Sequence, residues 1–134
     1  MKNSVNLIQK YLINNKINYL YLPPAVLSIL PKKDYPNLKT IIYAGEPCDK
    51  DTAKYWSKKK QLFNIYGPTE TTIYALKKEI LDGEVEQIGK PLQNITIYIL
   101  DKNRNPATVG IKGELFIGGE GLARGYINNP KLTN

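Results

Sequence analysis

The chain has 134 residues, enough for one ordinary domain, and 42% of them are apolar, which is enough for a real core. It contains no histidine, which excludes Ser-His-Asp and Cys-His nucleophiles and every histidine-ligated zinc site. Its single cysteine, Cys48, cannot form an internal disulfide, and we interpret it as a spare thiol in a loop that leads into a helix. Catalysis would have to use carboxylates, hydroxyls, lysines, backbone amides or a bound cation, which suits phosphate chemistry with Mg²⁺.

The formal net charge is +7, and Lys58, Lys59 and Lys60 are adjacent. A basic balance can indicate a nucleic-acid or anionic membrane partner. Lysine is nevertheless scattered along the whole chain together with Asn, Ile and Tyr, so we expect a solvated surface and neither of these partners. No run approaches the ~20 apolar residues of a membrane span, and the first residues alternate polar and apolar types. We therefore predict a cytoplasmic protein.

The first 80 residues alternate helical and extended patterns. Short apolar runs stopped by Pro or Gly predict strands, and residues with three- and four-residue apolar spacing predict helices. We expect helices at 4–14, 25–30 and 49–59, and strands at 17–22, 39–44 and 62–65. Strands separated by helices indicate βαβ units, and hence a partial parallel sheet whose strand ends can hold a ligand.

From about residue 80 the chain becomes β-rich. We expect strands at 73–80, 95–100 and 114–118, joined by turns such as Leu81-Asp82-Gly83, and we interpret this half as a barrel-like piece. The last residues, from Pro130, have the pattern of a helix opening. The fold class is thus α/β, with a subdomain seam near residue 80 inside a single domain comprising residues 1–134.

The most informative segment is Asn64-Ile65-Tyr66-Gly67-Pro68-Thr69-Glu70-Thr71-Thr72. Gly67 would let the backbone approach a phosphate, Thr69 offers a hydroxyl, and Glu70 can hold a hard cation, while the Tyr66 ring can stack on a base. By residue type alone, an ordinary surface turn is the favoured interpretation, because Gly-Pro-Thr is common in loops.

The order of several segments changes that judgement, because together they resemble the adenylation domains of nonribosomal peptide synthetases, in the adenylate-forming ligase superfamily. Tyr-Gly-Pro-Thr-Glu resembles their phosphate and adenine motif. The matching flanks are Leu22-Pro23-Pro24, Ile41-Ile42-Tyr43-Ala44-Gly45-Glu46, Ile88-Gly89-Lys90-Pro91 and the segment from Gly113 to Tyr126. The resemblance covers essentially the whole chain and implies an internal, incomplete part of the large N-terminal subdomain of such a ligase.

The resemblance implies that ATP or AMP is bound with Mg²⁺ in the complete domain. Asn64 would hydrogen-bond the adenine amino group, Tyr66 would stack on the ring, Thr69 would contact the α-phosphate, and Glu70 would bind Mg²⁺, which makes Thr69 and Glu70 the catalytic pair. The cofactor-binding set implied is Gly45, Glu46, Asn64, Tyr66, Gly67 and Thr69.

The resemblance also implies a pocket for the amino-acid side chain. Its lining would be Tyr21, Ile42, Ala44, Ile65, Ile73 and Tyr74. For Ile42 and Ile65 a core position and a pocket position are equally consistent with apolar strand residues, whereas a tyrosine at a strand end, such as Tyr21, more often faces a cavity. We interpret the glycines from Gly118 to Gly125 as residues of tight turns and close packing.

The parent activity implied is formation of aminoacyl-AMP and pyrophosphate, followed by transfer to a carrier-protein thiol. The family's phosphate loop, its ribose-binding aspartate, its amino-group aspartate and its catalytic lysine match nothing in residues 1–134. We therefore expect the isolated chain to be inactive, and unstable or self-associating. Other interpretations stay open: a piece of an acyl- or aryl-CoA ligase, a small basic binding module, or a non-functional gene remnant.

Overall fold

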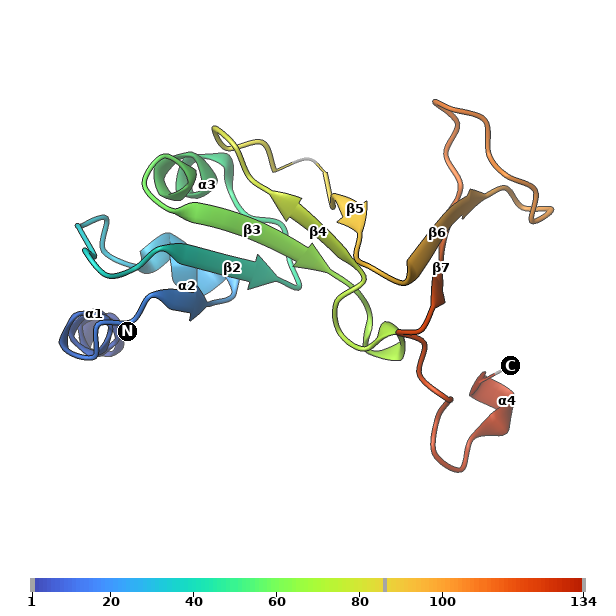
Figure 1. Ribbon diagram of the computed structural model, residues 1–134, viewed down its shortest axis with the longest axis horizontal. Coiled ribbons are helices and arrows are strands. Elements are labelled where there is room, and N and C mark those ends of the chain that lie inside the picture. Colours follow the sequence, from blue (N-terminus) through green and yellow to red (C-terminus); the bar gives the residue numbers. More distant parts are fainter. Residues whose placement is uncertain (1, 86, 134) are drawn as a thin grey trace. The chain divides into compact units, whose positions relative to one another are not determined.

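The computed structural model describes residues 2–85 and 87–133 and divides into two compact units (Figure 1). Unit 1 comprises Met1–Ile65 and Lys77–Gly89, and unit 2 comprises Tyr66–Leu76 and Lys90–Asn134. The chain therefore enters unit 2 directly after residue 65, returns at residue 77 and leaves unit 1 again after residue 89.

Unit 1 alternates helices with parallel strands, which confirms the α/β interpretation of the first half. Strands β1, β2 and β3 are neighbours in that order, and each pair is parallel. The elements are α1 (Lys2–Asn14), β1 (Tyr19–Tyr21), α2 (Pro24–Ile29), β2 (Thr40–Ala44), α3 (Lys50–Ser57) and β3 (Gln61–Tyr66). The sheet order continues with β4 (Leu76–Glu79) and β5 (Lys90–Pro91).

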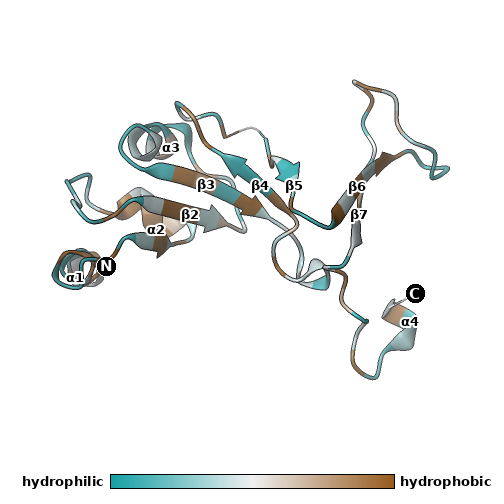
Figure 2. Cartoon of the chain, viewed as in Figure 1, coloured by the Kyte–Doolittle hydropathy of each residue, from teal (hydrophilic) through white to brown (hydrophobic). Residues whose placement is uncertain are grey.

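The core of unit 1 lies on one face of this sheet. Leu20, Ile41 and Leu62 are register partners, so their side chains point to the same side. Ile41 and Leu62 belong to one buried cluster with side chains from all three helices, namely Leu12, Leu27, Ala53 and Trp56. Figure 2 shows the corresponding hydrophobic stretches along β2 and β3. Burial of these side chains is the main favourable contribution to the folding of the unit.

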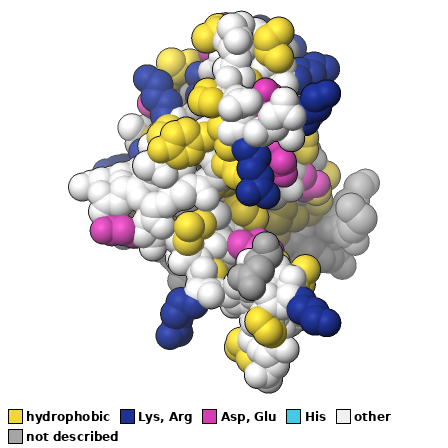
Figure 3. Space-filling view, turned by 90° about the vertical axis from the view of Figure 1, so that its right-hand side faces the viewer, with side chains coloured by type: hydrophobic (Ala, Val, Ile, Leu, Met, Phe, Trp, Pro, Cys, Tyr) yellow, Lys and Arg dark blue, Asp and Glu magenta, His cyan; other side chains and the backbone are white. Residues whose placement is uncertain are grey.

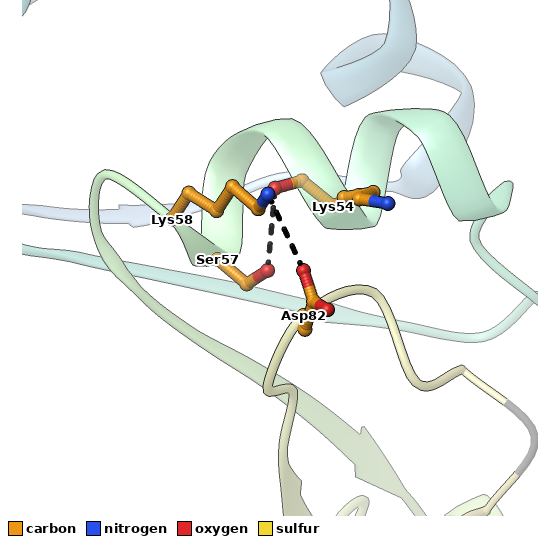
Figure 4. Close-up of polar contacts among 4 residues, drawn as sticks. All are labelled: Lys54, Ser57, Lys58 and Asp82. Atoms are coloured by element: carbon orange, nitrogen blue, oxygen red, sulfur yellow. Dashed lines mark hydrogen bonds and ion pairs between the residues drawn. The ribbon is translucent and has the colours of Figure 1, made fainter.

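Helix α3 is fixed at both ends by local contacts. The Asp49 carboxylate caps its N-terminus by accepting a hydrogen bond of 2.8 Å from the backbone N–H of Thr52. Near its C-terminus, Lys58 Nζ lies 3.5 Å from a carboxylate oxygen of Asp82 (Figure 4). Gly83 in the same turn has φ +82°, and a Cβ there would lie 2.9 Å from the Cβ of Lys54. The predicted Leu81-Asp82-Gly83 turn thus lies against α3. Glycine is required at position 83 because its φ is positive and because a side chain there would clash with Lys54.

Two protic side chains of this core ionise poorly. Burial raises the pKa of the Cys48 thiol to about 11, and it also raises the pKa of the Tyr43 hydroxyl, in each case because the charged form loses its hydration. Cys48 is buried directly before α3, which agrees with a structural thiol in a helix-leading loop. Both groups therefore stay protonated at neutral pH and are unsuited to nucleophilic chemistry.

Unit 2 is built around an antiparallel pair, β6 (Ile95–Leu100) and β7 (Glu114–Gly119), with Ile97 opposite Ile117. A 3₁₀ turn, Thr69–Thr71, and the short helix α4 (Pro130–Thr133) complete it. The strand expectations at 95–100 and 114–118 are confirmed, and α4 lies where a helix opening was predicted. The strands among residues 90–133 form no closed barrel, so this half is a β-rich but open piece.

The expected strand at 73–80 is shorter than predicted, because β4 begins only at Leu76. Thr72 and Ile73 have φ values of +59° and +73°, which are incompatible with an extended strand. The two-residue strand β5 has no apolar alternation and was not predicted. Both differences arise from tertiary contacts, which local residue patterns do not encode.

The cap at Asp49 gives a stability prediction with a defined pH dependence. The hydrogen bonds from Thr52 hold the pKa of this carboxyl below its usual value. Asp49→Ala should lower the free energy of unfolding of unit 1 by about 1 kcal/mol near neutral pH. Because the folded pKa is depressed, this difference should be complete above the unfolded pKa of about 4 and shrink as the pH falls through the folded value.

Denaturant unfolding followed by the fluorescence of Trp56, which is fully buried and is the single tryptophan, measures this difference. Asp49→Asn is the matched control, since asparagine keeps a capping oxygen and has no charge to titrate. An Asp49→Ala difference that stays constant down to pH 2 would contradict the assignment.

Candidate functional site

Four of the six predicted pocket residues lie together in unit 1. Tyr21 is the register partner of Ile42, and Ala44 is the register partner of Ile65. Ala44 follows Ile42 by two positions, so all four side chains point to one face of the sheet. This is the face opposite Ile41 and the helices. The parallel strands thus bring the predicted pocket residues together at their carboxyl ends.

That face is apolar and partly open. Tyr21 is 51% exposed, Ile42 and Ala44 are half-buried, and Ile65 is 8% exposed. Phe63, the register partner of Ile42, shares the face, with the Lys77 ammonium 5.1 Å from its ring centroid. Apolar side chains at the end of a parallel sheet provide contact area for an apolar or aromatic ligand group.

The Gly45-Glu46 segment has a structural role in unit 1. Gly45 ends β2 with φ +89°, a conformation that favours glycine. A Glu46 carboxylate oxygen accepts a hydrogen bond of 3.2 Å from the backbone N–H of Ala25, in the first turn of α2. The residue preceding that helix, Pro23, provides no side-chain cap. Glu46 therefore provides an acceptor for one N–H of the first turn, while the Pro23 carbonyl accepts from Val26 and Leu27.

Asn64 and Tyr66 lie two positions apart on β3 but belong to different units. Asn64 is half-buried, and its register partner is Tyr43, which places it on the helix-covered side of the sheet. Tyr66 is the last residue of the strand, has an exposed side chain and opens the unit 2 segment.

In unit 2, the turn after β3 is held by close backbone contacts. The Tyr66 carbonyl accepts a hydrogen bond of 2.8 Å from the Ala75 N–H. A Cβ at Gly67 would lie 2.6 Å from the Ala75 nitrogen and 2.7 Å from the Ile73 carbonyl oxygen. Residues 73–75 thus pass directly over residue 67. Glycine at this position is required by the protein's own backbone, independently of any phosphate.

Ile73 and Tyr74, the two remaining predicted pocket residues, lie in this overlying segment. Ile73 is 58% exposed and has φ +73°, which is an unfavourable backbone conformation for a β-branched residue. Such strain persists only where neighbouring contacts impose it. Here the contacts are those of Gly67 and of the Ala75–Tyr66 hydrogen bond.

We expect Gly67→Ala to displace residues 73–75, because its methyl group would overlap two backbone atoms. Gly110→Ala is the control: Gly110 also lies in unit 2, its φ is +88°, and a Cβ there would meet open space. Backbone amide spectra should show large chemical-shift changes at residues 73–75 in the first variant and not in the second. Unchanged resonances of these residues in Gly67→Ala would contradict the close approach.

Thr69 and Glu70 are exposed on this turn and border a cavity of about 600 Å³ in unit 2. Leu122, Ala123 and Tyr126 also line the cavity. The Tyr126 hydroxyl donates a hydrogen bond to the Glu70 carboxylate, which lowers the pKa of that carboxyl and raises the pKa of the phenol. Glu70 is therefore ionised at neutral pH. Tyr126 was not among the predicted site residues. It lies 56 positions after Glu70, and no sequence pattern indicates a contact between the two.

The predicted cation site has to be judged by its donors. Within residues 2–85 and 87–133 no three His, Cys, Asp or Glu side chains are grouped so that they could hold a metal. Glu70 offers a hard, exposed carboxylate, and Mg²⁺ is typically held by one or two carboxylates together with phosphates and waters. The residues therefore fit a divalent cation held weakly at Glu70, with nucleotide phosphates and waters as the remaining ligands.

The basic cluster of unit 1 is engaged in local contacts. Lys60 Nζ donates to the Tyr35 carbonyl at 2.7 Å, Lys58 pairs with Asp82, and Lys59 lies over the Tyr55 ring. These contacts account for the cluster as part of the surface around α3.

Exposed apolar side chains occur in both units. In unit 2 they include Tyr98, Val109, Ile111, Leu122 and Ile127. Figure 3 shows hydrophobic side chains at several separate places, interrupted by polar side chains and backbone. None of the helices in the described part of the chain is both long and apolar enough to cross a membrane.

A family model described as AMP-binding enzyme matches residues 2–127. Bacitracin synthase 3 of Bacillus licheniformis is 41% identical over 126 residues, which cover 94% of this chain and 2% of that protein. Novobiocin biosynthesis protein H of Streptomyces niveus is 37% identical over 127 residues, covering 94% of this chain and 21% of that protein. The chain therefore spans a small part of these relatives.

Two solved structures are also similar. One is the crystal structure of holo-AB3403, a four-domain nonribosomal peptide synthetase bound to AMP and glycine, with TM-score 0.84 and 36% identity over 93% of this chain and 10% of that one. The other is the N-terminal subdomain of Klebsiella oxytoca NpsA, with TM-score 0.84 over 97% of this chain and 34% of that one. At 21% identity, the second similarity concerns the fold alone.

Proposed function

We propose that this chain, which belongs to the AMP-binding enzyme family, forms part of an adenylation domain. In this proposal the domain activates an amino acid for nonribosomal peptide synthesis. Sequence similarity to peptide synthetases over most of the chain supports this proposal. The structural similarity to a synthetase that was solved with AMP and glycine supports it further.

The observation that carries the proposal is the turn at Thr69 and Glu70. A hydroxyl and an ionised carboxylate are exposed side by side at one cavity, on a backbone held by contacts at Gly67 and Ala123. Phosphoryl and nucleotidyl transfer require mainly positioning and charge neutralisation. This chain can provide both functions without a histidine.

In the proposed reaction, a carboxylate oxygen of the amino acid attacks the α-phosphorus of ATP in line. The bond from that phosphorus to the bridging oxygen breaks, and pyrophosphate leaves with the electron pair. Thr69 donates a hydrogen bond to an α-phosphate oxygen, and Glu70 holds the cation that accompanies the phosphates. Bound Mg²⁺ supplies neutralisation of the charge on the phosphate oxygens.

The adenine and the amino acid occupy separate groups of residues in this proposal. For the base we propose Tyr66 in unit 2, and Asn64, Gly45 and Glu46 in unit 1. For the amino-acid side chain we propose the sheet face formed by Tyr21, Ile42, Ala44 and Ile65 in unit 1, and Ile73 and Tyr74 in unit 2. A carrier-protein thiol then attacks the aminoacyl carbonyl, the bond to the phosphate oxygen breaks, and AMP leaves. These steps are proposed for the larger protein, and we expect no adenylation from residues 1–134 alone.

Ligand-observed NMR tests nucleotide binding by the chain itself. A partial site should bind AMP with about millimolar affinity, near 4 kcal/mol, because the cost of immobilising the ligand offsets most of the contacts. We expect saturation transfer to the adenine protons of AMP, loss of this transfer in Tyr66→Ala, and normal transfer in Tyr98→Ala, which alters an exposed tyrosine of β6.

Charge-driven binding would give a different pattern. In that case GMP and AMP would behave alike, and Lys59→Ala would remove the signal while Tyr66→Ala would not. Such a result would overturn the assignment of Tyr66 to the base and favour a basic binding module.

A further inference from the structure

The segment that follows β7 contacts the Thr69–Thr72 turn at three places within unit 2. The Ala123 N–H donates a hydrogen bond of 2.7 Å to the Glu70 carbonyl. Thr72 Oγ1 donates to the Gly121 carbonyl, also at 2.7 Å. The Tyr126 hydroxyl donates to the Glu70 carboxylate. Glu70 is thus held through both its backbone and its side chain by residues about fifty positions away.

Glycines bring this segment close to the turn. A Cβ at Gly121 would lie 3.2 Å from the Thr71 carbonyl oxygen and 2.8 Å from the Ile95 side chain. Larger residues at 121 would therefore push the segment away from the turn. This agrees with the prediction that glycines in this region serve close packing.

The backbone of Tyr126 is fixed from the other side. Its N–H donates a hydrogen bond of 2.9 Å to Thr133 Oγ1, in α4. Gly125 has φ +135°, and a Cβ there would lie 2.7 Å from the same oxygen. Thr133 in turn donates to the Asn129 carbonyl at 3.1 Å. The phenol is therefore aimed at Glu70 from a backbone that α4 holds in place.

The chemistry of this contact suits a cation ligand. A carboxylate has about four lone-pair sites, and here the Tyr126 hydroxyl and the Glu70 backbone N–H occupy two of them. The others remain available to a cation, while the hydrogen bonds restrict the rotation of the carboxylate. Groups that orient a metal ligand in this way typically contribute 10- to 100-fold to metal affinity.

We propose that Tyr126 is a positioning residue that orients the Glu70 carboxylate for a divalent cation, through the hydroxyl and not through packing of its ring. This inference rests on the proposed function of Glu70. Tyr126 is 43% exposed, so part of its surface is packed, and Tyr126→Phe keeps that packing while it removes the hydroxyl. Removal of the hydroxyl alone should therefore leave unit 2 folded.

The test uses Mn²⁺ alone as the probe, titrated into the ¹⁵N-labelled chain. Paramagnetic broadening of the Thr69–Thr72 amides reports cation binding at the turn. Broadening near Asp82 and Glu84, two carboxylates of unit 1, serves as an internal reference. We expect Tyr126→Phe to raise the Mn²⁺ concentration for half-broadening at 69–72 about tenfold, and to leave the reference unchanged.

Three further variants separate the explanations. Tyr98→Phe removes an exposed hydroxyl elsewhere in unit 2 and should behave as the unaltered chain. Tyr126→Leu should lose as much affinity as Tyr126→Phe if the hydroxyl matters. Without metal, the Glu70 side-chain carboxyl ¹³C resonance, assigned by its absence in Glu70→Gln, should shift in Tyr126→Phe and not in Tyr98→Phe.

The outcomes distinguish this inference from the proposed function. If Glu70→Gln leaves the broadening unchanged, then the assignment of Glu70 as cation ligand is wrong. If Glu70→Gln abolishes the broadening and Tyr126→Phe binds Mn²⁺ normally, then the cation site stands and the positioning role of Tyr126 is wrong. Loss of binding in Tyr126→Leu but not in Tyr126→Phe would assign Tyr126 to packing and would also overturn the inference.

Discussion

The turn after β3 depends on how closely other backbone segments approach it. Residues 73–75 pass over Gly67 at a distance that leaves no room for a Cβ, and the Ala75–Tyr66 hydrogen bond fixes that approach. The segment after β7 reaches the same turn at Glu70 through Ala123. With its backbone held at both ends, the turn can present the Thr69 and Glu70 side chains to solvent without reordering when a ligand binds.

The same constraint explains which features the sequence could predict. The helices and parallel strands of unit 1 follow from local apolar spacing and from Pro and Gly breaks, and these were predicted nearly to their ends. The register that gathers Tyr21, Ile42 and Ala44 on one face follows from strand periodicity once the strands are parallel. The family resemblance located the turn itself.

Other features could not be predicted, because they depend on tertiary contacts that residue types do not indicate. The left-handed conformation of Ile73 ends the expected strand early, and a β-branched residue type does not predict that conformation. The partner of Glu70, Tyr126, lies on the far side of the β6–β7 pair in the chain. The hydrogen bond of Glu46 to α2 likewise joins residues separated by 21 positions, so its structural role was not apparent.

Amide hydrogen exchange at Ala75 and Ala123 reports directly on the restraint of the turn, because each N–H closes one of the contacts that hold it. Both amides should exchange slowly, and Gly67→Ala should accelerate the two together, since they restrain the same segment. If Ala123 exchanges at the rate of an unstructured amide while Ala75 is protected, then the segment after β7 does not hold the turn, and the turn is not restrained at both ends.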